Sequence, residues 1–263
     1  MDIRDFEFKV YSQNGEDGIL DLLIEALDLD SSYSAYPRAF IEFGVENYRE
    51  SNTRYLLRKR CFAGLVMDGS LENIKQIKAD DLVSIAHDLE ARCAFITREN
   101  INSLLEDYLH TRKLNNVAIL SIDIDGVDYF VWEAIKCVEP AIVVIEFNAI
   151  FGANCCVSVP YRADFNRFKA HHSGLYFGAS LPALLSLGIK KGYVLVGCDR
   201  SSTNAFFIHK SLVDKFPFIL APLQEYCLAH DCRQSRDVQG NFTYLSGEAR
   251  LKEIAHLPLH SIA

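Results

Sequence analysis

The chain has 263 residues, of which 49% are hydrophobic and 24% charged, and its formal net charge is −8. This length and composition fit a globular protein with a well-buried core, and the acidic balance argues against a nucleic-acid partner, because phosphate affinity comes from lysine and arginine. No apolar run approaches the roughly 20 residues that span a bilayer, so we expect no membrane span. The acidic start of the chain lacks the pattern of a signal peptide, which predicts a cytoplasmic protein.

Five short apolar runs rich in Ile and Val recur along the first 150 residues, and helical patterns lie between them. Such runs are typical of strands buried on both faces of a parallel sheet. The runs cover residues 39–44, 63–69, 93–96, 117–123 and 141–147. The helical patterns cover residues 15–29, 51–60, 71–78, 100–112 and 127–136, the second with Ser51 or Asn52 as its N-cap. Strand alternating with helix predicts an α/β, Rossmann-like doubly wound sheet.

The later part of the chain departs from this alternation. Residues 180–192 predict a helix ended by Gly192, and the runs 193–199 and 204–209 predict an antiparallel hairpin. A mostly parallel sheet that finishes in such a hairpin is similar to the class I methyltransferase type. We therefore expect one domain over residues 1–215, with 150–178 as a lid or insertion and 216–263 as a C-terminal extension.

Acidic residues lie at four of the five predicted strand ends. Ligands of open α/β sheets bind at the carboxyl ends of the strands, so charge is tolerated there because these ends leave the core. The residues at the ends are Glu42 and Gly44, Asp68 and Gly69, Phe95 to Thr97, Asp123 and Asp125, and Glu146 and Asn148. Asp68 follows Gly44 by 24 residues, a position where an acid receives ribose hydroxyls. Asp68 could equally open the turn with Gly69.

The stretch DIDGVD (residues 123–128) has three interpretations. Its carboxylates could bind a hard cation such as Mg²⁺, supply a general base, or cap the following helix through Asp125 or Asp128. We expect at least one of the three acids to be only a cap and Asp123 to be the ligand. Residues two apart on a strand face the same side, so Glu146 and Asn148 at the neighbouring end could add oxygen ligands.

Histidines and cysteines are further candidates for catalysis or metal binding. His171 and His172 lie in the predicted lid, where adjacent histidines on extended backbone are expected to point different ways, and His172 is the candidate catalytic base. The eight cysteines form no C-x-x-C pair, which argues against a zinc ribbon or a thioredoxin-type motif. There is no nucleophile-elbow or P-loop motif.

Several blocks occur in an order that resembles the FkbM-like family of S-adenosylmethionine-dependent methyltransferases. The resemblance spans about residues 8–215 and is carried by YSQNGEDGIL (11–20), FIEFGVE (40–46), SNTRYL (51–56), GLVMDGS (64–70), LSIDIDGVDYFVWEAI (120–135), VVIEFNA (143–149), YFGASLPALLSLGIKKGYVLVGC (176–198) and TNAFFIHKSL (203–212). The chain departs from the usual glycine-rich first loop at Val45, Glu46 and Asn47.

This resemblance implies S-adenosylmethionine as cofactor and O-methylation of a sugar or polysaccharide-related hydroxyl, with Mg²⁺ as a candidate metal. It implies a small-molecule or glycan acceptor and leaves a homo-oligomer open. Residues 12–17 would fold over the cofactor or acceptor mouth. The implied cofactor residues are Glu42, Gly44, Asn52, Asp68, Gly69, Ile96, Thr97 and Asp123, and the implied metal ligands are Asp123, Asp125, Glu146 and Asn148.

Two other functions stay open at this point. One is a non-catalytic methyltransferase-fold module that binds a partner, which the unusual first loop allows. The other is a metal-dependent hydrolase or another transferase that uses the D-x-D element without S-adenosylmethionine.

Overall fold

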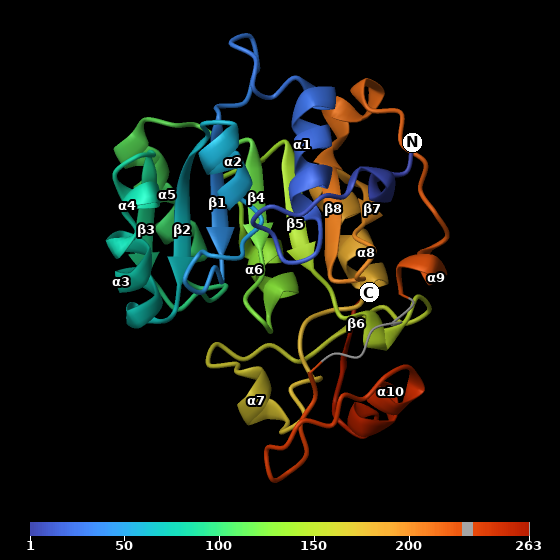
Figure 1. Cartoon of the computed structure of the whole chain (residues 1–263). Coiled ribbons are helices and arrows are strands. Elements are labelled where there is room, and N and C mark those ends of the chain that lie inside the picture. The colour runs from blue at the N-terminus through green and yellow to red at the C-terminus, as the bar shows by residue number, and fades with distance from the viewer. Residues whose placement is uncertain (228–233, 263) are drawn as a thin grey trace.

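A seven-stranded sheet forms the centre of the computed structural model, which describes residues 1–227 and 234–262 (Figure 1). The strand order is β3-β2-β1-β4-β5-β8-β7. Strands β1 to β5 are parallel to one another, and β8 is antiparallel to both β5 and β7. The strands are β1 (Ala39–Phe43), β2 (Ala63–Asp68), β3 (Leu89–Cys93), β4 (Ile119–Ile122), β5 (Ile142–Glu146), β7 (Tyr193–Cys198) and β8 (Asn204–His209).

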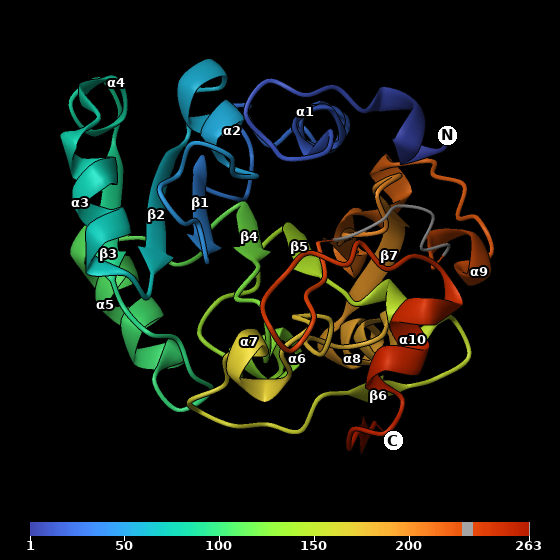
Figure 2. The ribbon, with the colours of Figure 1, turned by 60° about the horizontal axis from the view of Figure 1, so that its bottom comes forward.

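Helices cover both faces of the sheet (Figure 2). One face packs against α1 (Glu16–Leu27), α2 (Arg54–Lys59), α3 (Leu71–Ala79) and α4 (Asp81–Ser84). The other face packs against α5 (Ile101–Arg112), α6 (Asp128–Ala134) and α8 (Leu181–Lys191). The two apolar faces explain why the central strands are buried along their whole length and read as continuous apolar runs.

A third, smaller apolar cluster lies below the carboxyl ends of the parallel strands (Figure 1). There β6 (Val157–Ser158) pairs antiparallel with β9 (His260–Ser261), so the end of the chain returns to residues 150–178. Ile254 of α10 (Glu248–Ile254) packs in the same cluster as Ile150 and Tyr176. The remaining elements are η1 (Ile3–Phe6), η2 (Ala149–Phe151), α7 (Arg167–Ala170), η3 (Lys210–Lys215) and α9 (Leu223–Tyr226).

The predicted fold class is confirmed. The alternation of strand and helix and the C-terminal hairpin agree with the sequence. The structure adds the place of the hairpin, with β8 inserted between β5 and β7. The end of α8 is also as predicted, because Gly192 has a left-handed backbone with φ of 85° and its N–H caps the helix.

Two local predictions were wrong. The third strand is Leu89–Cys93 rather than residues 93–96, because an edge strand has one open side and tolerates the polar residues Glu90 and Arg92, so no continuous apolar run marks it. The N-cap of α2 is Thr53, without a side-chain cap, rather than Ser51 or Asn52. Those two residues are held instead by a carboxylate of β1, as described below.

No helix within residues 1–227 and 234–262 has the length and apolar character needed to cross a membrane. The seven cysteines in these residues are free thiols, and Cys232 lies outside the described residues.

Candidate functional site

Two adjoining cavities lie at the carboxyl ends of the parallel strands. The described residues enclose about 330 Å³ in cavity 1 and about 550 Å³ in cavity 2. Volumes of this size suit small molecules and cofactors. The residues that line both cavities are Gly44, Glu46, Asp123, Asp125, Arg167 and Phe168. The cavities therefore meet at the DIDGVD loop.

Cavity 1 combines acids from the ends of β2 and β4 with apolar walls. Asp68 and Gly69 at the end of β2 line it, together with Phe95 and Ile96, which follow β3. Phe165 from residues 150–178 also contributes to its wall. A flat aromatic group attached to a hydroxylated ring fits this combination, because apolar walls accept the aromatic group and a carboxylate accepts hydroxyl protons.

Cavity 2 is more polar. Glu42 and Asn52 line it from the first βα unit, and Glu146 and Asn148 line it from the end of β5. Residues 201–204 add the turn between β7 and β8. The N-terminal residues 13, 14 and 16 also line it, so the stretch 12–17 does lie at the mouth of this cavity. A polar lining of this kind suits a ligand with many hydroxyl groups.

Gly44 brings the ends of β1 and β4 into close approach. Its φ is 71°, and a Cβ placed there would lie 1.5 Å from the carbonyl oxygen of Asp123. Only glycine accepts both this backbone conformation and this contact. The glycine predicted for the cofactor loop thus sets the spacing between the two strand ends that form the shared wall.

Glu42 organises the loop before α2. Its buried carboxylate accepts hydrogen bonds from the Ser51 hydroxyl at 3.1 Å and from the Asn52 and Thr53 N–H groups at 2.9 and 3.1 Å. The Thr53 hydroxyl donates a further bond to it. Burial raises the pKa of Glu42. The Asn52 amide in turn donates to the Ser121 hydroxyl at 3.1 Å, which places Asn52 at the wall of cavity 2.

Asp68 has a demonstrated structural role. One of its oxygens accepts bonds from Ser70 N–H at 2.8 Å and from the Asn73 amide at 3.0 Å, and the other accepts from Glu46 N–H at 2.8 Å. The turn interpretation is therefore confirmed. The ribose interpretation stays a prediction, and it is compatible with the position of Asp68 because each carboxylate oxygen has two lone pairs.

Three carboxylates gather where the cavities meet. Oxygens of Asp123, Asp125 and Glu146 all lie within 4.8 Å of one another. Burial, followed by the like charge of Glu146, raises the pKa of Asp123 well above its ordinary value. Two carboxyl groups this close repel each other when both are ionised. A shared proton or a bound cation removes this repulsion.

The other acids of the DIDGVD loop are held by protein contacts. Asp128 accepts bonds from Ile124 N–H at 2.8 Å and Gly126 N–H at 3.0 Å, and it is fully buried. The expectation that one of these acids caps the following helix was wrong, because the N-cap of α6 is Val127 and no side chain caps it. Asp128 has a different structural role, since it closes the loop. Asp125 has a left-handed backbone with φ of 56° and pairs with Arg167.

Three predicted site residues have other contacts in the structure. Thr97 is not among the residues that line the two cavities, and it exchanges hydrogen bonds with Asn100 at the start of α5. Asn148 lines cavity 2, but its amide bonds to the Leu175 and Phe177 carbonyls and to Ile150 N–H. The third residue is His172, which pairs with an acid of the C-terminal segment.

His172 pairs with Glu253 of α10, with 3.2 Å between Nε2 and Oε1, and is not among the residues that line the two cavities. The structure thus does not bring it together with Asp123. The expectation that the adjacent histidines point different ways was also wrong, since the ring centroids of His171 and His172 are only 4.2 Å apart. Both rings face α10 because residues 150–178 pack on the C-terminal segment.

The sequence analysis missed several residues of the site. Arg167 and Phe168 of α7 line both cavities, and Arg250 of α10 lines cavity 2. The alternation of aromatic and basic residues in the stretch DFNRFK (residues 164–169) was a usable signal for the first two. No local pattern marks Arg250, because only the return of the chain end brings α10 to the strand ends.

The sheet order, the antiparallel β8 and the cavities at the carboxyl ends define a class I methyltransferase-like fold. No protein-family model matches the chain, and no curated protein matches it in sequence. The resemblance to the FkbM-like family therefore stays a prediction.

Solved structures with a similar fold are distant. The N-terminal domain of EvdMO1 with SAH bound is 13% identical, with 75% of this chain and 80% of that chain covered and a TM-score of 0.46. An O-methyltransferase family protein from Burkholderia thailandensis is 13% identical, with coverage of 73% and 57% and a TM-score of 0.40. PKMT2 from Rickettsia typhi in complex with AdoHcy is 10% identical, with coverage of 84% and 57% and a TM-score of 0.47. Likeness at this level carries no argument about chemistry.

Proposed function

We propose that this protein is an S-adenosylmethionine-dependent methyltransferase of the FkbM-like type that acts on a hydroxyl of a sugar or polysaccharide-related acceptor. The observation that carries the proposal is the meeting of the two cavities at Asp123. Cavity 1 has the acid and the apolar walls that an adenosine group needs, and cavity 2 has a polar lining. In the proposal the two ligands approach each other where the shared wall is acidic.

We assign separate residues to the ribose, the adenine and the amino-acid part of the cofactor. Asp68 and Gly69 are proposed to hold the ribose, and Ile96 with Phe95 the adenine, since they line cavity 1 together. Gly44 and Asn52, held by Glu42, are proposed to receive the amino-acid part near cavity 2. S-adenosylmethionine supplies an electrophilic methyl group when bound.

The chain's own contribution is orientation and proton transfer. Asp123 is proposed as the general base that accepts the proton of the acceptor hydroxyl, because its raised pKa makes its carboxylate a stronger base than an exposed one. Glu146 stabilises a proton on this pair of acids. Arg167 and Phe168, which line both cavities, are proposed to close the site and exclude water.

Mg²⁺ is a proposed addition to this mechanism. Asp123, Asp125 and Glu146 supply the hard oxygen ligands that Mg²⁺ prefers. We leave Asn148 out of the set, since its amide is engaged in three hydrogen bonds. A bound cation would lower the pKa of an acceptor hydroxyl. Arg167 beside Asp125 is the alternative source of positive charge.

One observation favours the alternative of a non-catalytic binding module. Both oxygens of Asp68 accept hydrogen bonds from the protein, and Glu46 and Tyr48 of the first loop have left-handed backbones. These hydrogen bonds give Asp68 a structural role that needs no cofactor.

Calorimetric titration with S-adenosylhomocysteine, with and without Mg²⁺, tests the proposal. We expect binding in the micromolar range and at least a tenfold loss of affinity in Asp68→Asn, because hydrogen bonds to a charged group contribute about 1.5–3 kcal/mol. Asp81→Asn is the matched control, since Asp81 is exposed in the same βα unit. No binding by the wild-type protein up to roughly 1 mM, a contribution below about 4 kcal/mol, would reject the cofactor assignment and favour the binding module.

A further inference from the structure

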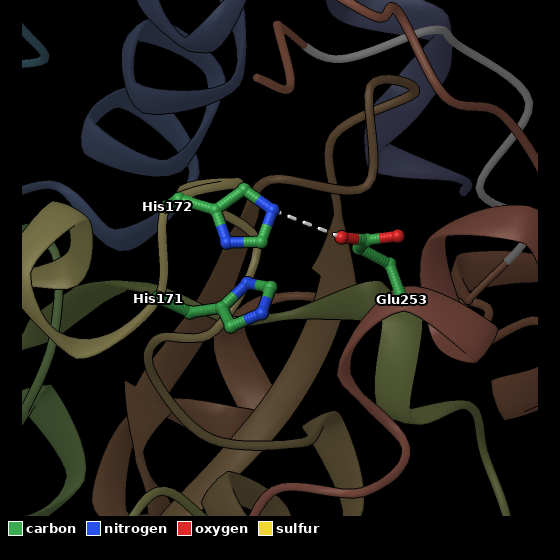
Figure 3. Close-up of side chains that lie close together, drawn as sticks. All are labelled: His171, His172 and Glu253. Atoms are coloured by element: carbon green, nitrogen blue, oxygen red, sulfur yellow. Dashed lines mark ion pairs between the residues drawn. The ribbon is translucent and has the colours of Figure 1, made fainter. Parts of the chain in front are cut away.

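Two histidines and a glutamate form a second cluster of metal-ligating side chains, apart from the acids at the strand ends. His171 and His172 follow α7, and Glu253 lies on α10 (Figure 3). One ligand atom of each residue lies within 4.8 Å of the others. Figure 3 shows the two imidazole rings side by side and the Glu253 carboxylate turned toward them.

The donor set is that of a transition metal. Imidazole nitrogens with a carboxylate oxygen suit Zn²⁺ and its neighbours in the first transition row, whereas Mg²⁺ prefers oxygen ligands alone. Bonds of about 2.0–2.1 Å in a tetrahedral site place two ligand atoms roughly 3.3 Å apart. The 3.2 Å between His172 Nε2 and Glu253 Oε1 already matches this spacing.

The surroundings prepare His171 as a ligand. Its Nδ1 lies 2.8 Å from the Ser173 hydroxyl. In the tautomer with the proton on Nδ1, this N–H donates to the hydroxyl and leaves Nε2 for a metal. A hydrogen bond on the second ring nitrogen is a common support of metal-binding histidines.

The cluster is open to solvent at one side. The side chains of His172 and Glu253 are 34% and 35% exposed, so an ion can enter without unfolding of the segment. His256 lies next to the cluster, with its ring centroid 5.8 Å from that of His171.

We propose that His171, His172 and Glu253 bind a Zn²⁺-type transition-metal ion that fastens residues 150–178 to the C-terminal helix α10. The ion joins two segments that are about 80 residues apart in sequence. The pairing of β6 with β9, the hydrogen bond from the Tyr176 hydroxyl to the Pro258 carbonyl and a small apolar cluster also connect these parts of the chain. Arg167 and Phe168 on one segment and Arg250 on the other line the cavities. Metal binding would thus hold the outer wall of cavity 2 in place.

Zn²⁺ titration of the full chain, after treatment with a chelator, tests the inference. We expect one Zn²⁺ per chain with a dissociation constant at or below roughly 1 μM, and at least a tenfold weaker binding in His172→Ala and in Glu253→Gln. Glu248→Gln is the matched control, because Glu248 lies on the same helix and its side chain is 90% exposed. Asp123→Asn separates this site from the strand-end acids and is expected to keep Zn²⁺ binding.

A second experiment measures the rate of proteolysis within residues 150–178. Zn²⁺ is expected to slow proteolysis within residues 150–178 of the wild-type chain and of Glu248→Gln, and to have no such effect on Glu253→Gln. Zn²⁺ binding that both His172→Ala and Glu253→Gln retain, or that Asp123→Asn abolishes, would overturn the inference. Absence of binding to the wild-type chain would do the same and would leave His172 and Glu253 as an ion pair. None of these outcomes depends on methyltransferase activity.

Discussion

Replacement of Gly44 by alanine tests whether the close approach of β1 and β4 holds the site together. The new Cβ would lie 1.5 Å from the Asp123 carbonyl oxygen, and the residue would keep a φ of 71°. A left-handed backbone costs about 1–2 kcal/mol for a residue other than glycine, and overpacking against atoms that cannot move aside costs about 1–3 kcal/mol more. We expect a loss of about 2–5 kcal/mol in the free energy of unfolding.

Urea denaturation of the two proteins measures this loss through the midpoint and slope of unfolding. Gly69→Ala is the matched control at the end of β2. Its Cβ would meet only the Phe95 ring at 3.3 Å, and its φ is not among the positive values, so we expect a change below about 1 kcal/mol. Equal midpoints for Gly44→Ala and the wild type would refute the reasoning.

Two further changes test the loop that follows β4. Burial raises the pKa of Asp128 to about 6 from 3.8, so this acid stabilises the fold fully below about pH 4 and loses about 3 kcal/mol of stability as the pH rises through 6. The difference in unfolding free energy between wild type and Asp128→Asn should fall by that amount from pH 3 to 7, and a constant difference would contradict the assignment. In Gly126→Ala the Cβ would lie 2.3 Å from the Phe165 ring, which should displace the ring from cavity 1 and weaken S-adenosylhomocysteine binding several-fold. The same change in a Phe165→Ala background should have little effect, and equal effects in both backgrounds would show that the ring is not involved.

The strand positions were predictable where a strand is buried on both faces. In β1, β4 and β5 every residue is buried, and each gives a short apolar run. The same criterion failed for β3, since the sequence LEARC has the polar side chains that an edge strand tolerates. The apolar residues that we assigned to this strand follow it and include Ile96 in the wall of cavity 1.

The sequence predicted where the candidate site lies. It predicted the role of each residue in the site less well. Parallel strands end at one edge, so acids at the ends of β2, β4 and β5 had to lie near one another. The path of the loop decides which acid faces the cavity and which accepts hydrogen bonds from backbone N–H groups. Asp123 faces both cavities, whereas Asp128 closes the loop through two N–H groups.

The sequence by itself determined the doubly wound sheet, its terminal hairpin and the edge at which the acids gather, because each depends on local hydrophobic pattern and on strand direction. Only the tertiary structure decided how residues 150–178 and the chain end enclose that edge. The pairing of Val157 with Ser261 and the contact of His172 with Glu253 join residues about 80–100 positions apart. No local periodicity encodes such contacts, since their free energy depends on surfaces that exist only after the chain has folded.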